Sequence, residues 1–231
     1  MKEETIEDLQ LNGLRLIQKK KGFRFGVDAV ILSNFAKVKA GDSVLDIGTG
    51  TGVIPILLSA KSKAKHLTGI EIQEQFAEMA KRSVDLNGLG DRISIVLGDI
   101  KDWLTIFGKS KFDLVVTNPP YIEHKTGLKN ESESVTIARH EVKCSLEDIV
   151  SAAAGVLKPN GRLAMVHRPH RLVDILEVFR KFDIEPKYLQ FVCSHKNESP
   201  VMVLIHGTKY GRKELRIQEN LYIFGDKEEI E

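Results

Sequence analysis

The chain has 231 residues, of which 42% are hydrophobic and 29% are charged, and its formal net charge is +2 at pH 7. This composition is typical of a globular protein with one large core, and the small net charge excludes a strong overall attraction to nucleic acids. No hydrophobic run approaches the ~20 residues that span a bilayer, and the acidic start MKEETIEDLQ is unlike a secretory signal. Cys144 and Cys193 are too few and too far apart for a disulfide framework or a zinc site. We therefore expect a cytoplasmic monomer with no membrane contact and no metal.

The N-terminal region predicts a β-hairpin followed by a helix. Apolar residues alternate from Leu9 to Leu16 on both sides of Asn12-Gly13, the pair that best accepts a type I′ turn. A connector over residues 22–26 then leads to a helix that begins at Asp28 and ends near Lys37.

From residue 43 onward, strand and helix patterns alternate. The pattern predicts strands at 43–47, 67–72, 93–97, 113–116 and 162–166, and helices at 53–60, 75–87, 100–107, 146–157 and 169–182. This alternation is typical of an α/β fold with a parallel sheet covered by helices on both faces. Two further strands, 187–194 and 201–208, are too close in sequence for a crossover helix and are therefore predicted to be antiparallel.

These elements predict a Rossmann-like, doubly wound sheet, mostly parallel with an antiparallel final strand, plus a short N-terminal β-hairpin. We expect a single domain over residues 1–231. It comprises an N-terminal extension (1–40), a core (41–208) and a C-terminal extension (209–231). The polar segment 122–145 interrupts the alternation, and loops of this length in compact domains are usually functional.

A glycine-rich loop joins the first core strand to its helix. In the segment from Asp46 to Val53, glycines at positions 48, 50 and 52 let the backbone approach a ligand closely, and the helix N-terminus favours negative groups. A dinucleotide fingerprint would need glycine at position 53, so Val53 disfavours an NAD-dependent dehydrogenase. The absence of a G-x-x-x-x-G-K-[ST] sequence argues against an NTPase.

Acidic residues end the next two strands. Glu71 lies about 20 residues beyond the glycine loop, where a carboxylate can accept hydrogen bonds from both ribose hydroxyls. Asp99 ends the following strand, and ligands of open α/β sheets bind along this carboxyl edge. Two acids without a phosphate-binding lysine favour a nucleoside ligand that lacks phosphates.

The sequence Asn118-Pro119-Pro120-Tyr121 follows a buried strand and removes two consecutive backbone donors. The stretch is therefore stiff and presents mostly acceptors, including the side-chain carbonyl of Asn118. Such a cluster suits a planar amine with two N–H donors. Accepting both hydrogens stabilises the pyramidal, positively charged nitrogen that forms during group transfer, while Tyr121 stacks on the acceptor ring.

These motifs, in this order, resemble class I S-adenosylmethionine-dependent methyltransferases over residues 23–208. The resemblance implies that methyl transfer takes place at Asn118, Pro119, Pro120 and Tyr121. It implies a site for S-adenosyl-L-methionine made of Phe25, Gly26, Asp46, Gly48, Thr49, Gly50, Glu71, Ile72, Asp99, Ile100 and Asn118. With the N-terminal hairpin, Phe23-Arg-Phe-Gly-Val-Asp-Ala and Ala138-Arg-His-Glu141, the chain is most similar to the tRNA adenine-N6 methyltransferases that act beside the anticodon of a valine tRNA.

By that resemblance the macromolecular partner is tRNA, bound by basic clusters. The residues expected to contact RNA are Lys19, Lys20, Lys21, Arg24, Arg139, His140, Lys209, Arg212 and Lys213. The same signature also admits a protein glutamine amide or the amines of rRNA and DNA, and an RNA-binding or nucleoside-binding protein without catalysis is a further alternative. His167 and His170 lack the partners of a metal site, and no G-x-S-x-G elbow supports a serine nucleophile.

Overall fold

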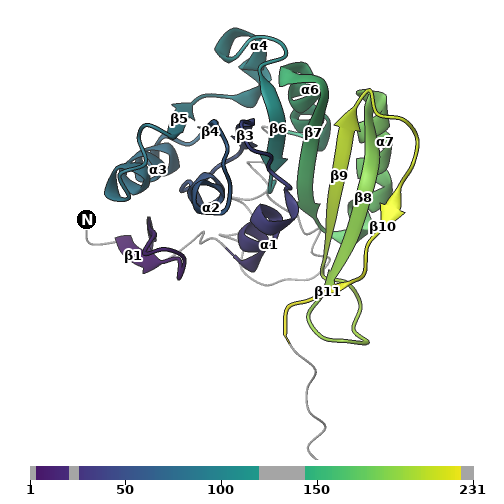
Figure 1. The fold of residues 1–231 in the computed structure, drawn as a ribbon, viewed down its shortest axis with the longest axis horizontal. Coiled ribbons are helices and arrows are strands. Elements are labelled where there is room, and N and C mark those ends of the chain that lie inside the picture. Colours follow the sequence, from purple (N-terminus) through teal and green to yellow (C-terminus); the bar gives the residue numbers. More distant parts are fainter. Residues whose placement is uncertain (1–3, 21–25, 120–143, 225–231) are drawn as a thin grey trace, which may run out of the picture.

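The computed structural model describes residues 4–20, 26–119 and 144–224, and these form one large sheet, a separate hairpin and flanking helices (Figure 1). The strands are β1 (Glu4–Asp8), β2 (Arg15–Lys19), β3 (Ser43–Ile47), β4 (His66–Glu71), β5 (Ile93–Leu97), β6 (Phe112–Thr117), β7 (Leu157–His167), β8 (Ile184–Cys193), β9 (Met202–Lys209), β10 (Arg216–Ile217) and β11 (Leu221–Tyr222). The helices are α1 (Val27–Phe35), α2 (Val53–Lys61), α3 (Glu74–Leu86), α4 (Trp103–Ile106), α6 (Leu146–Val156) and α7 (Leu172–Lys181), with 3-10 turns η1 (Ile100–Asp102) and η2 (Pro169–Arg171).

The large sheet has the strand order β5-β4-β3-β6-β7-β9-β8, and the pairs from β5 to β7 are all parallel. β9 runs antiparallel to both β7 and β8. The connection between β8 and β9 is too short for a crossover, which explains the antiparallel pairing of these two strands. The predicted fold class, a doubly wound and mostly parallel sheet with antiparallel strands at its end, is confirmed.

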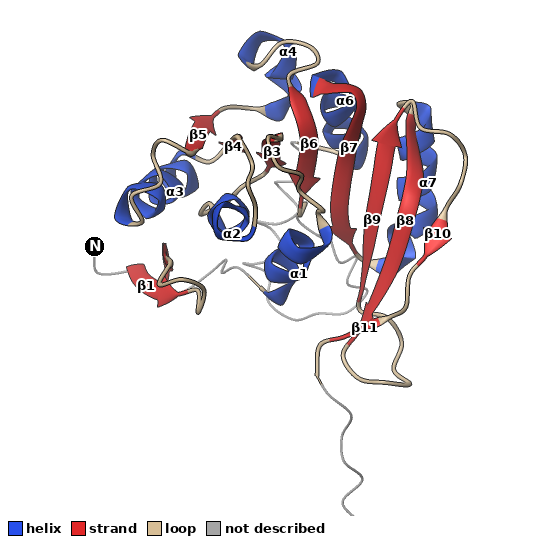
Figure 2. Cartoon of the chain, viewed as in Figure 1, coloured by secondary structure: helices blue, strands red, loops and turns tan. Residues whose placement is uncertain are grey.

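Helices cover both faces of this sheet (Figure 2). One hydrophobic cluster packs α1 and α2 against side chains such as Val44 and Leu114, and another packs α6 and α7 against their neighbours Leu45 and Val115. Successive strand residues point to opposite faces, so this division follows from the uninterrupted apolar runs in the strands. Among the helices of the described ranges, none combines the length and hydrophobicity needed to cross a bilayer.

The N-terminal hairpin has the predicted turn but different strands. Asn12 and Gly13 both have positive φ, 51° and 71°, and a backbone hydrogen bond of 2.9 Å closes the turn across them. The strand ladder begins only at Asp8 and Arg15, because Gln10 also has a positive φ of 52° and interrupts the expected alternation. The prediction that strands directly flank Asn12-Gly13 is therefore wrong.

The C-terminal extension runs along the outer side of β8. The short strands β10 and β11 pair in parallel with β8 at Tyr188–Leu189 and at Val192–Cys193. The side chains of Lys187 and Gln190 also donate hydrogen bonds of 2.7 and 2.9 Å to carbonyls of this segment. These two strands were not predicted, since each spans only two residues.

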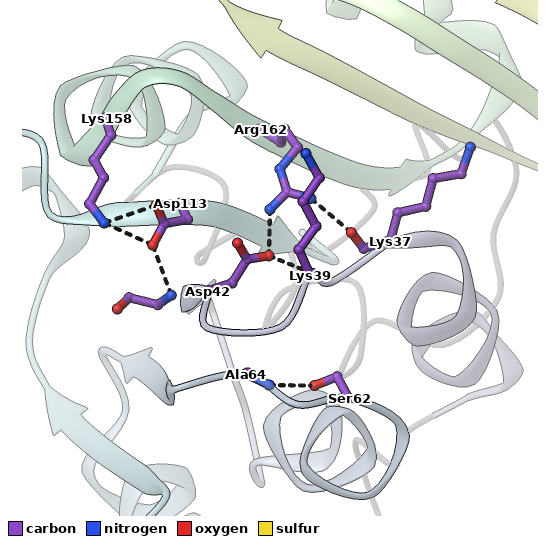
Figure 3. A network of polar contacts seen from close by, with 9 residues as sticks. Lys37, Lys39, Asp42, Ser62, Ala64, Asp113, Lys158 and Arg162 are labelled. Atoms are coloured by element: carbon purple, nitrogen blue, oxygen red, sulfur yellow. Dashed lines mark hydrogen bonds and ion pairs between the residues drawn. The ribbon is translucent and has the colours of Figure 1, made fainter.

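A partly buried polar network joins the amino ends of the parallel strands (Figure 3). Arg162 of β7, which pairs with Leu114 near the beginning of β6, forms a short ion pair with Asp42 and donates a 2.8 Å hydrogen bond to the carbonyl of Lys37, just beyond α1. Beside it, Asp113 of β6 accepts hydrogen bonds of 2.8 Å from the Lys158 ammonium and 2.9 Å from the backbone N–H of Ser43. The buried charges of Arg162 and Asp42 are tolerated because each has a partner, whereas Lys158 and Asp113 are partly exposed.

Candidate functional site

The acidic and amide residues singled out in the sequence come together at the carboxyl edge of the sheet. β3 lies between β4 and β6, so residues at the ends of these three strands are neighbours. Asp46, Glu71 and Asn118 come from these three strand ends, and Asp99 follows the next strand, β5. This carboxyl edge, at the opposite end of the sheet from the Arg162 network, is the candidate site.

The glycine-rich loop turns sharply over this edge. Gly48, Gly50 and Gly52 all have positive φ, of 74°, 56° and 85°, a conformation that side chains disfavour. The backbone N–H groups of Gly48 and Thr49 both donate 3.0 Å hydrogen bonds to the carbonyl of Ile70, which fixes the loop to β4. The loop is therefore held in a fixed position at the ends of the strands, where its backbone can contact a ligand.

Gly69 in β4 supports the glycine-rich loop, a role that the sequence analysis did not recognise. A Cβ built at Gly69 would lie 2.7 Å from Oγ1 of Thr49 and 2.8 Å from two of its carbon atoms. Glycine here therefore lets the loop pack directly on the neighbouring strand. A glycine inside an apolar strand pattern signals such a close approach and could have pointed to it.

Glu71 is nearly buried and oriented by two backbone donors. Its Oε2 accepts a 2.9 Å hydrogen bond from the N–H of Gly50, and its Oε1 accepts one of 2.9 Å from the N–H of Gln73. Each carboxylate oxygen has a second lone-pair direction, so Glu71 can still accept hydrogen bonds from ligand hydroxyls. The Gly50 contact also joins the acid to the glycine-rich loop.

Asp46 is a buried acid whose carboxylate oxygens receive no hydrogen bond of normal geometry from a described residue; it is 1% exposed. Burial raises its pKa to about 7, the nearby Thr49 hydroxyl opposes that rise, and the negative charge of Glu71 adds to it. An unsatisfied carboxyl group at a ligand-binding edge is well suited to meet a cationic group or a hydrogen-bond donor. Among the described residues, this carboxyl group is the clearest indication of a ligand-binding site.

Asp99 and its neighbours form the far end of the edge. Its Oδ1 accepts a 2.9 Å hydrogen bond from the backbone N–H of Lys101 and so caps η1. Ile72 follows the buried strand β4 and Leu97 ends β5, and their side chains are 40% and 46% exposed. Apolar side chains beside an acid provide surfaces on which a flat heterocycle can pack.

Asn118 lies directly after β6 and contacts α1. Its Nδ2 donates a 2.9 Å hydrogen bond to Oδ2 of Asp28, a residue 90 positions earlier in the chain. The preceding Thr117 is buried and donates a 3.0 Å hydrogen bond to the carbonyl of Ile47, which fixes the end of β6. Pro119 is buried, while Pro120 and Tyr121 lie outside the described residues.

Comparison with known protein families gives one match, a model described as the methyltransferase small domain, over residues 26–192. The chain belongs to the methyltransferase small domain family. The sequence-based resemblance to methyltransferases is thereby confirmed.

Curated relatives of this methyltransferase family member include two named tRNA1(Val) (adenine(37)-N6)-methyltransferase. The one from Porphyromonas gingivalis W83 is 37% identical over 158 residues, which cover 66% of this chain and 61% of that protein. The one from Trichodesmium erythraeum is 27% identical over 209 residues, which cover 88% of this chain and 83% of that protein. The chain thus matches less than two thirds of the length of the Porphyromonas protein.

Among solved structures, a predicted O-methyltransferase from Agrobacterium tumefaciens superimposes on this family member with a TM-score of 0.71 and 21% sequence identity. The superposition covers 87% of this chain and 90% of that one. At this level of identity the likeness shows the shared fold.

In this methyltransferase family member, the predicted RNA-contacting residues that the structure describes lie at two places, the carboxyl edge and the amino edge of the parallel strands. Lys19 reaches the carboxyl edge, where its ammonium donates a 2.7 Å hydrogen bond to Gln75 in the first turn of α3; Lys20 follows it and is exposed. Lys21, Arg24, Arg139 and His140, as well as the cofactor residue Phe25, lie outside the described residues.

The second basic cluster, which contains Lys209, Arg212 and Lys213, lies at the amino edge of the parallel strands. Lys209 pairs with the first residue of β8, and Arg212 and Lys213 follow it before the chain returns along β8. The Lys209 ammonium is buried and donates hydrogen bonds of 2.5 and 2.9 Å to the carbonyls of Ala154 and Leu157 at the end of α6. The Lys209 ammonium therefore has a structural role at the end of α6, and a contact between this residue and RNA stays a prediction.

Histidines and acids form no metal site in the described part of the chain, where no three potential ligands gather closely enough. His167 at the end of β7 is buried, which lowers its pKa to about 4, and its Nδ1 accepts a 2.8 Å hydrogen bond from the N–H of Arg168. Cys144 and Cys193 are free thiols.

Proposed function

We propose that this protein transfers a methyl group from S-adenosyl-L-methionine to the exocyclic N6 amine of an adenine in tRNA, beside the anticodon of a valine tRNA. The observation that carries the proposal is the position of Asn118. Its carboxamide sits at the same sheet edge as the glycine-rich loop and the two acids, with its nitrogen already held by Asp28. The names of the curated relatives support the choice of tRNA adenine.

The residues of the carboxyl edge fit the proposed cofactor. The orphaned carboxyl of Asp46 suits a ligand with cationic groups, and Glu71 retains acceptor capacity for two ribose hydroxyls. Ile72 and Leu97 offer apolar surface to the adenine, with Asp99 beside them as an acceptor for its amine. When bound, S-adenosyl-L-methionine supplies an electrophilic methyl group.

The side chain of Asn118 and the carbonyl of Pro119 act on the substrate amine. Delocalisation into the ring makes this nitrogen a poor nucleophile, so the protein must favour the pyramidal form that carries positive charge during transfer. Two acceptors that hold both amine hydrogens stabilise this form by fixed dipoles. The rigid backbone at Pro119 and the hydrogen bond from Thr117 keep these acceptors in place. Holding amine and methyl group close together provides much of the remaining acceleration.

RNA would approach the carboxyl edge. Exposed cations at this edge include Lys20 beside α3 and Lys196 after β8, and they can contact the phosphates of a loop from two sides. An adenine in a single-stranded loop costs little to extrude, so it can enter the site without a base-flipping wedge. We further propose that the protein acts in the cytoplasm as a monomer.

The proposal is tested with labelled S-adenosylmethionine and total tRNA from a strain that lacks this gene. After digestion, labelled N6-methyladenosine in one valine tRNA is the expected result. The matched control is Asn118→Ala, which should lose turnover and keep its affinity for the cofactor. Label in protein or rRNA would contradict the tRNA substrate. Full RNA and cofactor binding with no transfer to any acceptor would show a binding protein rather than an enzyme.

A further inference from the structure

One side-chain contact links the N-terminal helix to the residue placed at the substrate amine. Nδ2 of Asn118 donates a hydrogen bond of 2.9 Å to Oδ2 of Asp28, while Oδ1 of Asp28 accepts one of 3.0 Å from the N–H of Ala29. Both Asp28 and Asn118 are half-buried. Asp28 is therefore engaged through both oxygens and held in a fixed position at the beginning of α1.

This contact decides which way the Asn118 carboxamide faces. A carboxylate accepts hydrogen bonds and donates none, so only the NH₂ end of the carboxamide can point toward Asp28. The reversed carboxamide would bring an oxygen to within hydrogen-bond distance of the Asp28 oxygen, and the two negative atoms would repel each other. The carbonyl oxygen of Asn118 is thus directed away from α1.

A second, independent feature keeps this space open for the Asp28 carboxylate. A Cβ built at Gly26 would lie 2.7 Å from Oδ1 of Asp28. Gly26 has φ −106° and ψ 179°, which any residue can adopt, so the backbone conformation does not require glycine here. The steric requirement comes from the Asp28 side chain.

From these observations we infer that Asp28 is a positioning residue for amine methylation. This inference rests on the proposed function. Asp28 fixes the Asn118 carboxamide so that its oxygen accepts from the substrate amine. The negative charge on the nitrogen side also polarises the carboxamide and makes its oxygen a stronger acceptor. Asp28 itself needs no contact with the substrate.

A kinetic double-mutant cycle separates this role from one that Asp28 plays independently of Asn118, such as its hydrogen bond with Ala29 at the beginning of α1. Asp28→Ala should lower kcat by ~10- to 100-fold, with the KM for the cofactor within about twofold. In an Asn118→Ala background the same change should lower kcat by less than ~2-fold, because Asp28 acts through Asn118. Asp28→Asn can accept or donate, so it permits both carboxamide orientations and should give an intermediate kcat.

The same variants give a second readout by NMR. The side-chain NH₂ signal of Asn118, identified by its loss in Asn118→Ala, should shift in Asp28→Ala and in Gly26→Ala, which displaces the carboxylate without removing its charge. Thermal melts of every variant exclude unfolding as the cause, and Asp28→Asn carries the test if the alanine variant does not fold.

Three outcomes would overturn the reasoning at different points. An unchanged NH₂ signal in Asp28→Ala would contradict the contact itself, whatever the activity. Equal losses of kcat from Asp28→Ala in the wild-type and Asn118→Ala backgrounds would show that Asp28 acts independently of Asn118 and would overturn the positioning role. A wild-type protein that methylates no RNA would overturn the proposed function, and the positioning role would fall with it.

Discussion

The buried carboxyl group of Asp46 should couple cofactor binding to pH. Burial raises its pKa to about 7, so in the ligand-free protein the group is half protonated near neutrality. A ligand with positive charge favours the ionised form and lowers this pKa, which releases a proton on binding. The sign is therefore fixed: acid should weaken binding of S-adenosylmethionine.

The size of the effect follows from the ionised fraction. With a pKa of about 7, roughly three quarters of Asp46 is ionised at pH 7.5 and roughly 3% at pH 5.5. If only the ionised form binds, the Kd for the cofactor rises ~20-fold between these two values. The α-amino group of the ligand titrates near ~7.7–8.0, so it stays mostly protonated across this range.

Isothermal titration calorimetry measures both the Kd for the cofactor and the number of protons released on binding. At pH 6, titrations in two buffers with different heats of ionisation should reveal the release of ~0.9 proton per cofactor bound. Asp46→Asn should bind the cofactor with a Kd that is nearly the same at pH 5.5 and 7.5. A wild-type Kd that changes less than twofold, with no proton release, would show that Asp46 is not coupled to the ligand.

Three further perturbations test other parts of the structure. Asp42→Ala leaves the buried guanidinium of Arg162 without its carboxylate partner (Figure 3) and should lower the free energy of unfolding in urea by ~3–5 kcal/mol. The control Asp174→Ala, at an exposed ion pair, should change this free energy by less than ~1 kcal/mol. Burial lowers the pKa of His206 from 6.5 to about 4, so the unfolded chain binds a proton that the folded protein does not. Wild-type stability should fall by ~3 kcal/mol relative to His206→Phe as pH drops from 7 to 4, and parallel pH curves would contradict this. Lys20→Ala should weaken RNA binding and reduce the slope of log affinity against log salt by ~1, while Lys213→Ala at the opposite edge should match the wild type.

The sequence predicted those parts of the site that depend on local pattern. Glu71 ends β4 and Asp99 follows β5, and the carboxyl ends of parallel strands share an edge, so their proximity followed from the topology. The glycine-rich loop was recognisable because positive φ at Gly48 and Gly52 requires glycine in a strand-to-helix turn.

Contacts between segments that are distant in the sequence could not be predicted from the sequence pattern. Nothing in the spacing showed that Asp28 holds Asn118, since the two are 90 residues apart and belong to different elements. Lys209 was grouped with its basic neighbours, but only the strand register shows that it lies at the amino edge, where helix-terminal carbonyls bind its ammonium. Local charge predicts a basic cluster without showing which side of the sheet it occupies.

The C-terminal segment along β8 has a consequence for solubility. Without β10 and β11, the ten-residue strand β8 would present an open row of backbone donors and acceptors at the edge of the large sheet. Open edges of this kind pair with other chains and lead to aggregation. In the folded protein, the N–H groups of Gln218 and Ile223 donate to carbonyls of Leu189 and Cys193 at 2.7 and 3.0 Å. The segment from residue 210 to 224 thus covers the edge of β8, and removing this segment should make the protein prone to self-association.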